Sequence, residues 1–334
     1  MSSRWMKIVF CVLVLSALAT AQNINAAGAT FPYPIYSKWF NEYHQKTGSV
    51  QINYQAIGSG GGIKQLQVGT VDFGASDMPM TNEQLASTPF KVVHIPTVLG
   101  AVVPAYHIPG VNAELKFTPE ILAGIFLGHI NNWADPQIAK ANPGIKFPNQ
   151  SIVVVHRSDG SGTTFIFTDY LSKVSGEWKS SVGANTSVKW PVGIGGKGNE
   201  GVAGMVRQID GSIGYVELIY AVQNNIPYGQ VRNKAGNFIK ASLETTTAAA
   251  AGVKIPADYR VSITNPDGKY AYPLASFTWM LIPAVSKDPA KGKIIREFLE
   301  WEITEGQKQT SQLTYAPLPK EVANKVAATI KTIK

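Results

Sequence analysis

A polar stretch with the sequence HRSDGSGTT, residues 156–164, lies near the centre of this chain. It follows an apolar run, Ile152–Val155, of the kind that forms a buried strand. After it, apolar side chains recur at helical spacing, at Ile166, Tyr170 and Val174. The stretch is therefore predicted to be a turn that leads from a strand into a helix.

The residue types in this turn favour an anion as ligand. A helix start presents unpaired backbone N–H groups and a partial positive charge, and Ser161 and Thr163 fall near that start. Gly160 and Gly162 let a ligand approach the backbone, and Arg157 adds a fork of donors that suits an oxyanion. We therefore expect a tetrahedral anion here, although an ordinary capped helix with a surface arginine also fits these residues.

The first 21 residues are typical of a secretory signal peptide. Arg4 and Lys7 precede a short apolar core at Ile8–Ala19, and Ala19-Thr20-Ala21 forms a cleavage site. Cys11, the only cysteine, lies inside that core, so we expect no lipid attachment and no disulfide or thiolate in the mature chain. Later stretches are too short or too polar to cross a membrane. The sequence predicts an exported protein that does not itself span a membrane.

The charge balance argues against a nucleic-acid partner. Lys and Arg outnumber Asp and Glu by 30 to 22, a net charge of +8, and removing Arg4 and Lys7 leaves +6. The sequence contains no dense basic stripe and no basic patch interleaved with aromatic residues. We therefore expect no nucleic acid as partner, and a mildly positive surface that helps to gather small anions.

Short strand-like and helix-like segments alternate along the chain, which indicates an α/β fold. Two long extended segments, Thr97–Tyr106 and Tyr272–Pro283, are placed to run between two domains. We expect a first lobe built from residues 22–101 and 277–334 and a second lobe built from residues 102–276. The chain is long enough for two lobes with separate cores.

Polar turns follow several of the predicted strands. Thr30, Ser59 and Asp77 fall in the first lobe, and the turn at 157–163 falls in the second. Ligands of open α/β sheets bind at the carboxyl ends of the strands, where these turns lie. This arrangement suits a ligand clamped between two lobes.

Four motifs together resemble one family, the phosphate-binding proteins of the high-affinity bacterial phosphate transporter. They are GATFP at 28–32, GSGGG at 58–62, VDFGASD at 71–77 and RSDGSGT at 157–163. The resemblance covers essentially the whole mature chain. It implies a type II periplasmic binding protein fold, in which two α/β lobes are joined by a two-segment hinge. It also implies a monomer in the periplasm that binds inorganic phosphate, needs no cofactor, and delivers its ligand to inner-membrane permease subunits.

The same resemblance implies which residues bind phosphate: Thr30, Phe31, Ser59, Asp77, Arg157, Ser161, Gly162 and Thr163. Asp77 would accept the phosphate proton, and Asp159 would hold the guanidinium of Arg157. The other members would donate hydrogen bonds from hydroxyls or from the backbone. Gly60 stands where some relatives carry a second serine, and we assign no role to His156.

A secreted phosphohydrolase is the alternative function, because an anion cradle would serve it too. Hydrolysis would need a nucleophile with a base, or a pair of metal ions. DGSG at 159–162 is not a nucleophile elbow, which requires glycine two residues before the serine. The five histidines show no metal-ligand spacing, so we expect no metal site and favour a binding protein. Asp77 also has a purely structural interpretation, as a cap of the helix near Asn82.

Overall fold

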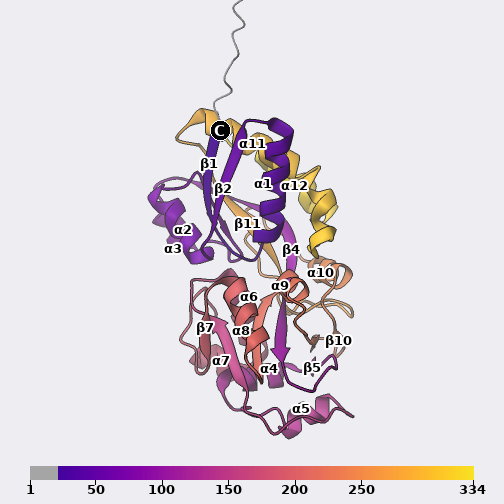
Figure 1. Cartoon of the computed structure of the whole chain (residues 1–334). Coiled ribbons are helices and arrows are strands. Elements are labelled where there is room, and N and C mark those ends of the chain that lie inside the picture. Colours follow the sequence, from indigo (N-terminus) through magenta and orange to yellow (C-terminus); the bar gives the residue numbers. More distant parts are fainter. Residues whose placement is uncertain (1–21) are drawn as a thin grey trace, which may run out of the picture.

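Two α/β halves lie one above the other in the computed structural model, which describes residues 22–334 (Figure 1). The predicted signal peptide, residues 1–21, lies outside the described residues. Within residues 22–334, no helix combines the length and the apolar character that a membrane crossing requires.

One eight-stranded sheet runs through both halves in the order β2-β1-β3-β11-β4-β8-β6-β7. Its strands are β1 (Gln22–Gly28), β2 (Val50–Ala56), β3 (Phe73–Ser76), β4 (Val92–His107), β6 (Val153–Arg157), β7 (Ile194–Gly196), β8 (Ser212–Glu217) and β11 (Ala275–Pro283). A three-stranded sheet contains β5 (Lys116–Phe117), β9 (Gln230–Arg232) and β10 (Phe238–Ile239). β1 is parallel to β2 and β3, and β6 is parallel to β7 and β8, so polar turns after these strands gather at shared sheet edges.

The long strand β4 connects the two halves. Its residues up to Ala101 pair with β11, and its residues from Val102 onward pair with β8. Every residue of β4 between Ile95 and Tyr106 is buried, which explains its continuous apolar sequence. The change of partner coincides with the lobe boundary expected after residue 101; the division into lobes as a whole stays a prediction.

Helices cover both faces of the sheet. They are α1 (Tyr33–Thr47), α2 (Ser59–Val68), α3 (Asn82–Ala86), α4 (Pro119–Leu127), α5 (Pro136–Ala141), α6 (Gly162–Val174), α7 (Gly176–Ser181), α8 (Gly198–Gln208), α9 (Leu218–Gln223), α10 (Leu243–Ala250), α11 (Pro289–Glu302), the 3₁₀ helix η1 (Gly306–Leu313) and α12 (Lys320–Ile330). Figure 1 shows α1 and α12 on one side of the first-lobe strands and α2 and α3 on the other. α1 buries Ile35, Trp39 and Tyr43, the face that its spacing predicts.

Two segments differ from the expected elements. The sequence Val71–Ala75 predicts a buried strand, but β3 begins only at Phe73. The carboxylate of Asp72 instead accepts hydrogen bonds from Lys291 Nζ at 2.9 Å and from the backbone N–H of Asn25 at 2.8 Å. The glycine-rich stretch 195–201 predicts the start of a helix that runs to Gln208, but Gly195 and Gly196 belong to β7, which pairs with β6. Gly196 leaves room for the close packing of α8, since an added Cβ would lie 2.8 Å from the backbone of Gly201 and Val202.

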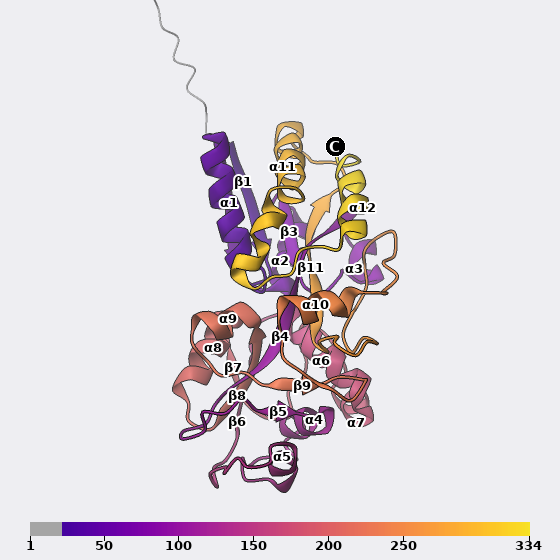
Figure 2. The ribbon, with the colours of Figure 1, turned by 90° about the vertical axis from the view of Figure 1, so that its right-hand side faces the viewer.

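The segment 251–274 contains no helix or strand, yet it touches both lobes. We call its residues 258–264 the strap, and Figure 2 shows this loop rising from α10 beside α3. Arg260 donates to the carbonyl oxygen of Met80 at 3.0 Å and to Asn82 Oδ1 at 2.9 Å, in the first lobe. Ser262 and Thr264 donate to Asp169 Oδ2 on α6, in the second lobe. The strap thus connects the lobes beside the β4–β11 crossing.

Candidate functional site

The turn from β6 to α6 has the expected form. β6 ends at Arg157, and Ser161 caps α6 by accepting a hydrogen bond from the backbone N–H of Thr164 at 3.0 Å. The turn therefore directs the first N–H groups of α6 toward the space between the lobes. Arg157 is only 3% exposed, which rules out the surface arginine of the alternative interpretation.

The guanidinium of Arg157 is held by Asp159. Nε and Nη2 bind the two carboxylate oxygens at 2.8 and 2.5 Å, and Nη1 donates to Thr163 Oγ1 at 3.3 Å. Burial acts to raise the pKa of Asp159, but the hydrogen bonds and charge of Arg157 outweigh it and hold that pKa below its usual value. This bidentate pair fixes the plane of the guanidinium and leaves it a buried cation at the end of β6.

Three turns of the first lobe face this group. Thr30 follows β1, Ser59 is the first residue of α2, and Asp77 follows β3. Each of the three side chains is at most 3% exposed. Ser59 Oγ accepts a hydrogen bond from the backbone N–H of Asp77 at 3.1 Å, which joins two of these turns.

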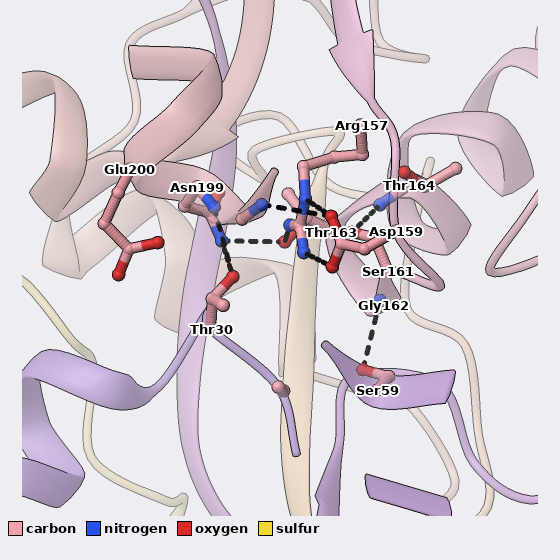
Figure 3. Close-up of polar contacts among 12 residues, drawn as sticks. Thr30, Ser59, Arg157, Asp159, Ser161, Gly162, Thr163, Thr164, Asn199 and Glu200 are labelled. Atoms are coloured by element: carbon pink, nitrogen blue, oxygen red, sulfur yellow. Dashed lines mark hydrogen bonds and ion pairs between the residues drawn. The ribbon is translucent and has the colours of Figure 1, made fainter. Parts of the chain in front are cut away.

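Hydrogen bonds cross directly from one lobe to the other (Figure 3). The backbone N–H of Gly162 donates to Ser59 Oγ at 3.1 Å, and the N–H of Gly60 donates to the carbonyl oxygen of Gly160 at 2.9 Å. A Cβ added to Gly60 would lie 3.2 Å from the Cα of Gly160, so the two backbones nearly touch. The structure is therefore closed, and it brings together every predicted site residue apart from the ring of Phe31.

Phe31 contributes only its backbone to this region. Its ring packs on Gly100, where an added Cβ would lie 2.5 Å from the ring, and its carbonyl oxygen accepts from Tyr315 Oη at 2.6 Å. The ring is buried in the core of the first lobe and positions the loop after β1. A ligand contact from Phe31 would therefore come from its backbone, and its role as a backbone donor stays a prediction.

Asp77 is the acceptor of the site. Thr278 Oγ1, from β11, donates to Asp77 Oδ1 at 2.8 Å. Burial raises the pKa of Asp77 to about 7, against the lowering effects of the Thr278 hydrogen bond and the Arg157 charge. The interpretation of Asp77 as a helix cap is wrong, because Thr81 caps α3 and accepts from the N–H of Gln84 at 3.2 Å.

Two residues that the sequence analysis missed complete the site. Asn199, in the first turn of α8, donates from Nδ2 to Thr30 Oγ1 at 2.8 Å and to Thr163 Oγ1 at 3.1 Å (Figure 3). Thr278 binds Asp77 from within an apolar strand. Two sequence features could have identified them. Thr278 is a polar residue in an apolar run, and Asn199 is an asparagine just inside a glycine-rich helix start.

His156 supports the turn from outside. Its ring stacks on Trp190, with 4.9 Å between centroids and 10° between planes, and its Nδ1 lies 3.0 Å from the carbonyl oxygen of Arg157. Burial lowers the pKa of His156, which favours the neutral ring. It therefore helps to hold the end of β6 and adds no charge to the site.

The arrangement can bind an oxyanion and accept one proton from it. Donors are the Arg157 guanidinium, the N–H groups at the start of α6 and the hydroxyls of Thr30, Ser59 and Thr163, and the one facing acceptor is Asp77. Within residues 22–334, no three His, Cys, Asp or Glu side chains are grouped closely enough to hold a metal ion. The chemistry of the site is therefore recognition of a small, partly protonated anion.

Comparisons with known proteins agree with this chemistry. Residues 16–305 match the PBP superfamily domain. The chain is 45% identical to the phosphate-binding protein PstS of Pasteurella multocida, over 99% of this chain and 96% of that protein. It is also 45% identical to PstS of Haemophilus influenzae, over 97% of each chain, and 39% identical to PstS of Methanocaldococcus jannaschii, over 90% of this chain and 83% of that one.

Solved structures share the fold. A high-affinity periplasmic phosphate-binding protein, solved with phosphate bound, superposes with a TM-score of 0.75 at 22% identity, covering 92% of this chain and 93% of that one. A substrate-binding protein from Clostridium perfringens with bound phosphate superposes with a TM-score of 0.67 at 17% identity, covering 89% and 100%. The predicted type II periplasmic binding protein fold is confirmed. This chain accordingly belongs to the family of phosphate-binding proteins of the ABC phosphate transporter.

Proposed function

We propose that the protein binds inorganic phosphate between its two lobes and delivers it to the membrane permease of an ABC phosphate importer. The observation that carries this proposal is the composition of the closed site, in which a buried arginine and several donors face one buried carboxyl group. Such a site matches an anion that has many acceptor oxygens and still carries a proton. The relatives named above are phosphate-binding proteins, which supports the same ligand.

The predicted contacts follow from the groups present. Arg157 binds phosphate oxygens, and the backbone N–H of Phe31 donates to another. The N–H of Gly162 donates to Ser59 Oγ in this structure and turns to a phosphate oxygen when the ligand is bound. Thr30, Ser59 and Thr163 donate from their hydroxyls, whereas Ser161 serves mainly as the cap that sets the start of α6. Asp77 accepts the phosphate O–H, and Asp159 keeps Arg157 in place.

The protein acts as a receptor rather than as an enzyme. Ser161, the obvious nucleophile, accepts a hydrogen bond from Thr164 and is committed to capping the helix. His156, the nearest histidine in sequence, stacks on Trp190 behind the turn. The alternative of a secreted phosphohydrolase is therefore not supported by a pair of Ser161 and His156, and none of the relatives above is named as a hydrolase.

Location and partners complete the proposal. We place the protein in the periplasm as a monomer, with inner-membrane permease subunits as partners, because the relatives are receptors of this transport system and the start of the sequence has the form of a signal peptide. Amino-terminal sequencing of exported protein should begin near Gln22; a retained Met1 would contradict this part.

Equilibrium binding of labelled phosphate tests the function directly. The wild type should bind phosphate, and a p-nitrophenyl phosphate assay on the same preparation should show no turnover. Arg157→Ala should weaken phosphate binding about thirtyfold or more, because truncating one partner of a buried charged pair costs ~2–5 kcal/mol. Binding within threefold of the wild type would remove Arg157 from the site, and hydrolysis that Arg157→Ala abolishes would favour the enzyme.

A further inference from the structure

Asn199 is fully buried where the two lobes meet. It belongs to α8 of the second lobe, yet its backbone N–H and its Nδ2 both donate to Oγ1 of Thr30 in the first lobe, at 3.2 and 2.8 Å. Nδ2 also donates to Thr163 Oγ1 at 3.1 Å. Figure 3 shows Asn199 between these two threonines. One amide therefore contacts a site hydroxyl on each side of the closed cleft.

The orientation of this amide is fixed by a backbone group. Oδ1 of Asn199 accepts from the N–H of Glu217 at 2.9 Å. A backbone N–H can only donate, so it selects the oxygen of the amide and turns the NH₂ group toward the threonines. Both hydrogens of that group are then used, one on each hydroxyl.

The hydroxyl oxygens have no acceptor capacity left. A hydroxyl has one hydrogen and two lone pairs. Thr30 Oγ1 accepts two hydrogen bonds from Asn199. Thr163 Oγ1 accepts one from Asn199 and one from Arg157 Nη1, the latter at 3.3 Å. Each hydroxyl can still donate its hydrogen and can accept nothing further.

Building on the proposed phosphate function, we propose that Asn199 is a positioning residue that makes the hydroxyls of Thr30 and Thr163 obligate donors toward phosphate. For Thr30 it does so only in the closed state, because Asn199 and Thr30 lie on opposite lobes. Closing the cleft thus completes the donor set at the same moment as it encloses the ligand. Hydrogen bonds to a charged ligand are stronger than neutral ones, so fixing these two donors favours the closed, anion-bound state.

A double-mutant cycle on phosphate affinity tests this proposal. Asn199→Ala and Thr30→Val should each weaken phosphate binding about tenfold or more. Because Asn199 acts through the Thr30 hydroxyl, the double variant should be weakened only about as much as the more affected single variant. Ser59→Ala is the matched control, since Ser59 Oγ contacts the N–H groups of Asp77 and Gly162 instead of Asn199. In the double variant Ser59→Ala/Asn199→Ala, the fold-loss of phosphate affinity should equal the product of the two single fold-losses.

The outcomes separate this proposal from the function on which it rests. If the losses of Asn199→Ala and Thr30→Val multiply, Asn199 does not act through Thr30 and the proposal is overturned. Thermal unfolding without phosphate checks that each variant is folded; Asn199→Ser, which adds no charge, replaces Asn199→Ala in the cycle if the latter unfolds. Failure of the wild type to bind phosphate would instead overturn the proposed function.

Discussion

Asp77 differs from the other groups in the site because an ionised carboxylate can only accept hydrogen bonds. Phosphate near neutral pH carries at least one O–H, and sulfate, which has nearly the same size and shape, carries none. Facing phosphate, Asp77 forms a charge-assisted O–H···O bond. Facing sulfate, it meets a bare oxyanion in a desolvated cleft, where like charges repel strongly. At the scale of one residue, selectivity is a penalty against the wrong anion.

Replacing this carboxylate should therefore relax selectivity while sparing phosphate. Asp77→Asn should leave phosphate binding largely intact, since the amide oxygen still accepts, and should strengthen sulfate binding, since the amide can present its N–H₂. Competition of sulfate against labelled phosphate at fixed ionic strength measures both. If sulfate competes equally poorly with wild type and variant, the discriminating group lies elsewhere.

The raised pKa of Asp77 gives this selectivity a pH dependence. With the pKa at about 7, the carboxyl is protonated below that pH, can donate to sulfate, and no longer repels it. Above pH 7 each sulfate complex must take up one proton, so sulfate affinity should fall about tenfold per pH unit, and it should level off as the pH drops below 7. Sulfate competition between pH 5 and 9 tests the slope. In Asp77→Asn the slope should vanish; an equal slope there would assign the proton to another group.

Single residues also show where sequence reasoning reached its limit. Arg157 and the Ser161 cap were evident from local pattern, because strand, turn and helix follow one another within a short stretch. Asn199 and Thr278 act through contacts with residues more than 100 positions away in the chain. The sequence around either residue does not identify these partners, so only the folded structure shows them.

Among the elements, the first turn of α6 fits tightly against the opposite lobe. A Cβ added to Gly162 would lie 2.5 Å from Asp77 Oδ2 and from Ser59 Oγ. Both atoms belong to the first lobe, whereas α6 belongs to the second. The glycine is thus required for closure rather than for the helix itself.

Gly162→Ala should consequently fold normally and fail to close on phosphate. At least two hydrogen bonds to the anion would be lost, each worth about 1.5–3 kcal/mol, so affinity should fall about a hundredfold or more. Gly204→Ala is the control, because Gly204 lies inside α8 with nothing within 4 Å of an added Cβ; it should bind as the wild type and gain up to about 1 kcal/mol of stability. Isothermal titration with phosphate and thermal unfolding make the comparison. Near-normal affinity in Gly162→Ala would mean that closure tolerates the methyl group.

An element could be predicted when neighbouring residues determine it, and was misplaced or missed when a distant partner determines it. The sequence predicts periodic helices such as α1 almost residue for residue, because one apolar face and a proline near the start define them. The start of β3 was misplaced because the ion pair between Asp72 and Lys291 joins distant parts of the chain. The short strand β7 was missed because its partner, β6, lies some 40 residues earlier.

For the whole molecule, the closed arrangement implies an open one. Thr30, Ser59, Asp77 and Arg157 are buried behind contacts between the lobes, so a ligand reaches them only when the lobes separate. The two extended segments that carry this motion could be predicted, since β4 and β11 are long apolar runs. The strap could not, because its residues have no periodicity and are held by scattered side-chain contacts, such as Arg260 to Met80.

Phosphate should therefore make the molecule more compact. A ligand that touches both lobes favours the closed state by its higher affinity for that state. Small-angle scattering should show a smaller radius of gyration at saturating phosphate than without it, and Gly162→Ala should show no such decrease. An unchanged wild-type profile at saturation would contradict closure by the ligand.

The near-contact of Gly60 with Gly160 also has a kinetic consequence. The backbones of the two lobes meet there, and Thr30, Ser59, Asp77 and Arg157 are at most 3% exposed. A bound anion is therefore enclosed, and its rate of dissociation cannot exceed the rate at which the lobes separate. Residence time is then a property of the contacts between the lobes as much as of the contacts to the ligand. A membrane partner that draws the lobes apart would accelerate release without touching the anion at all.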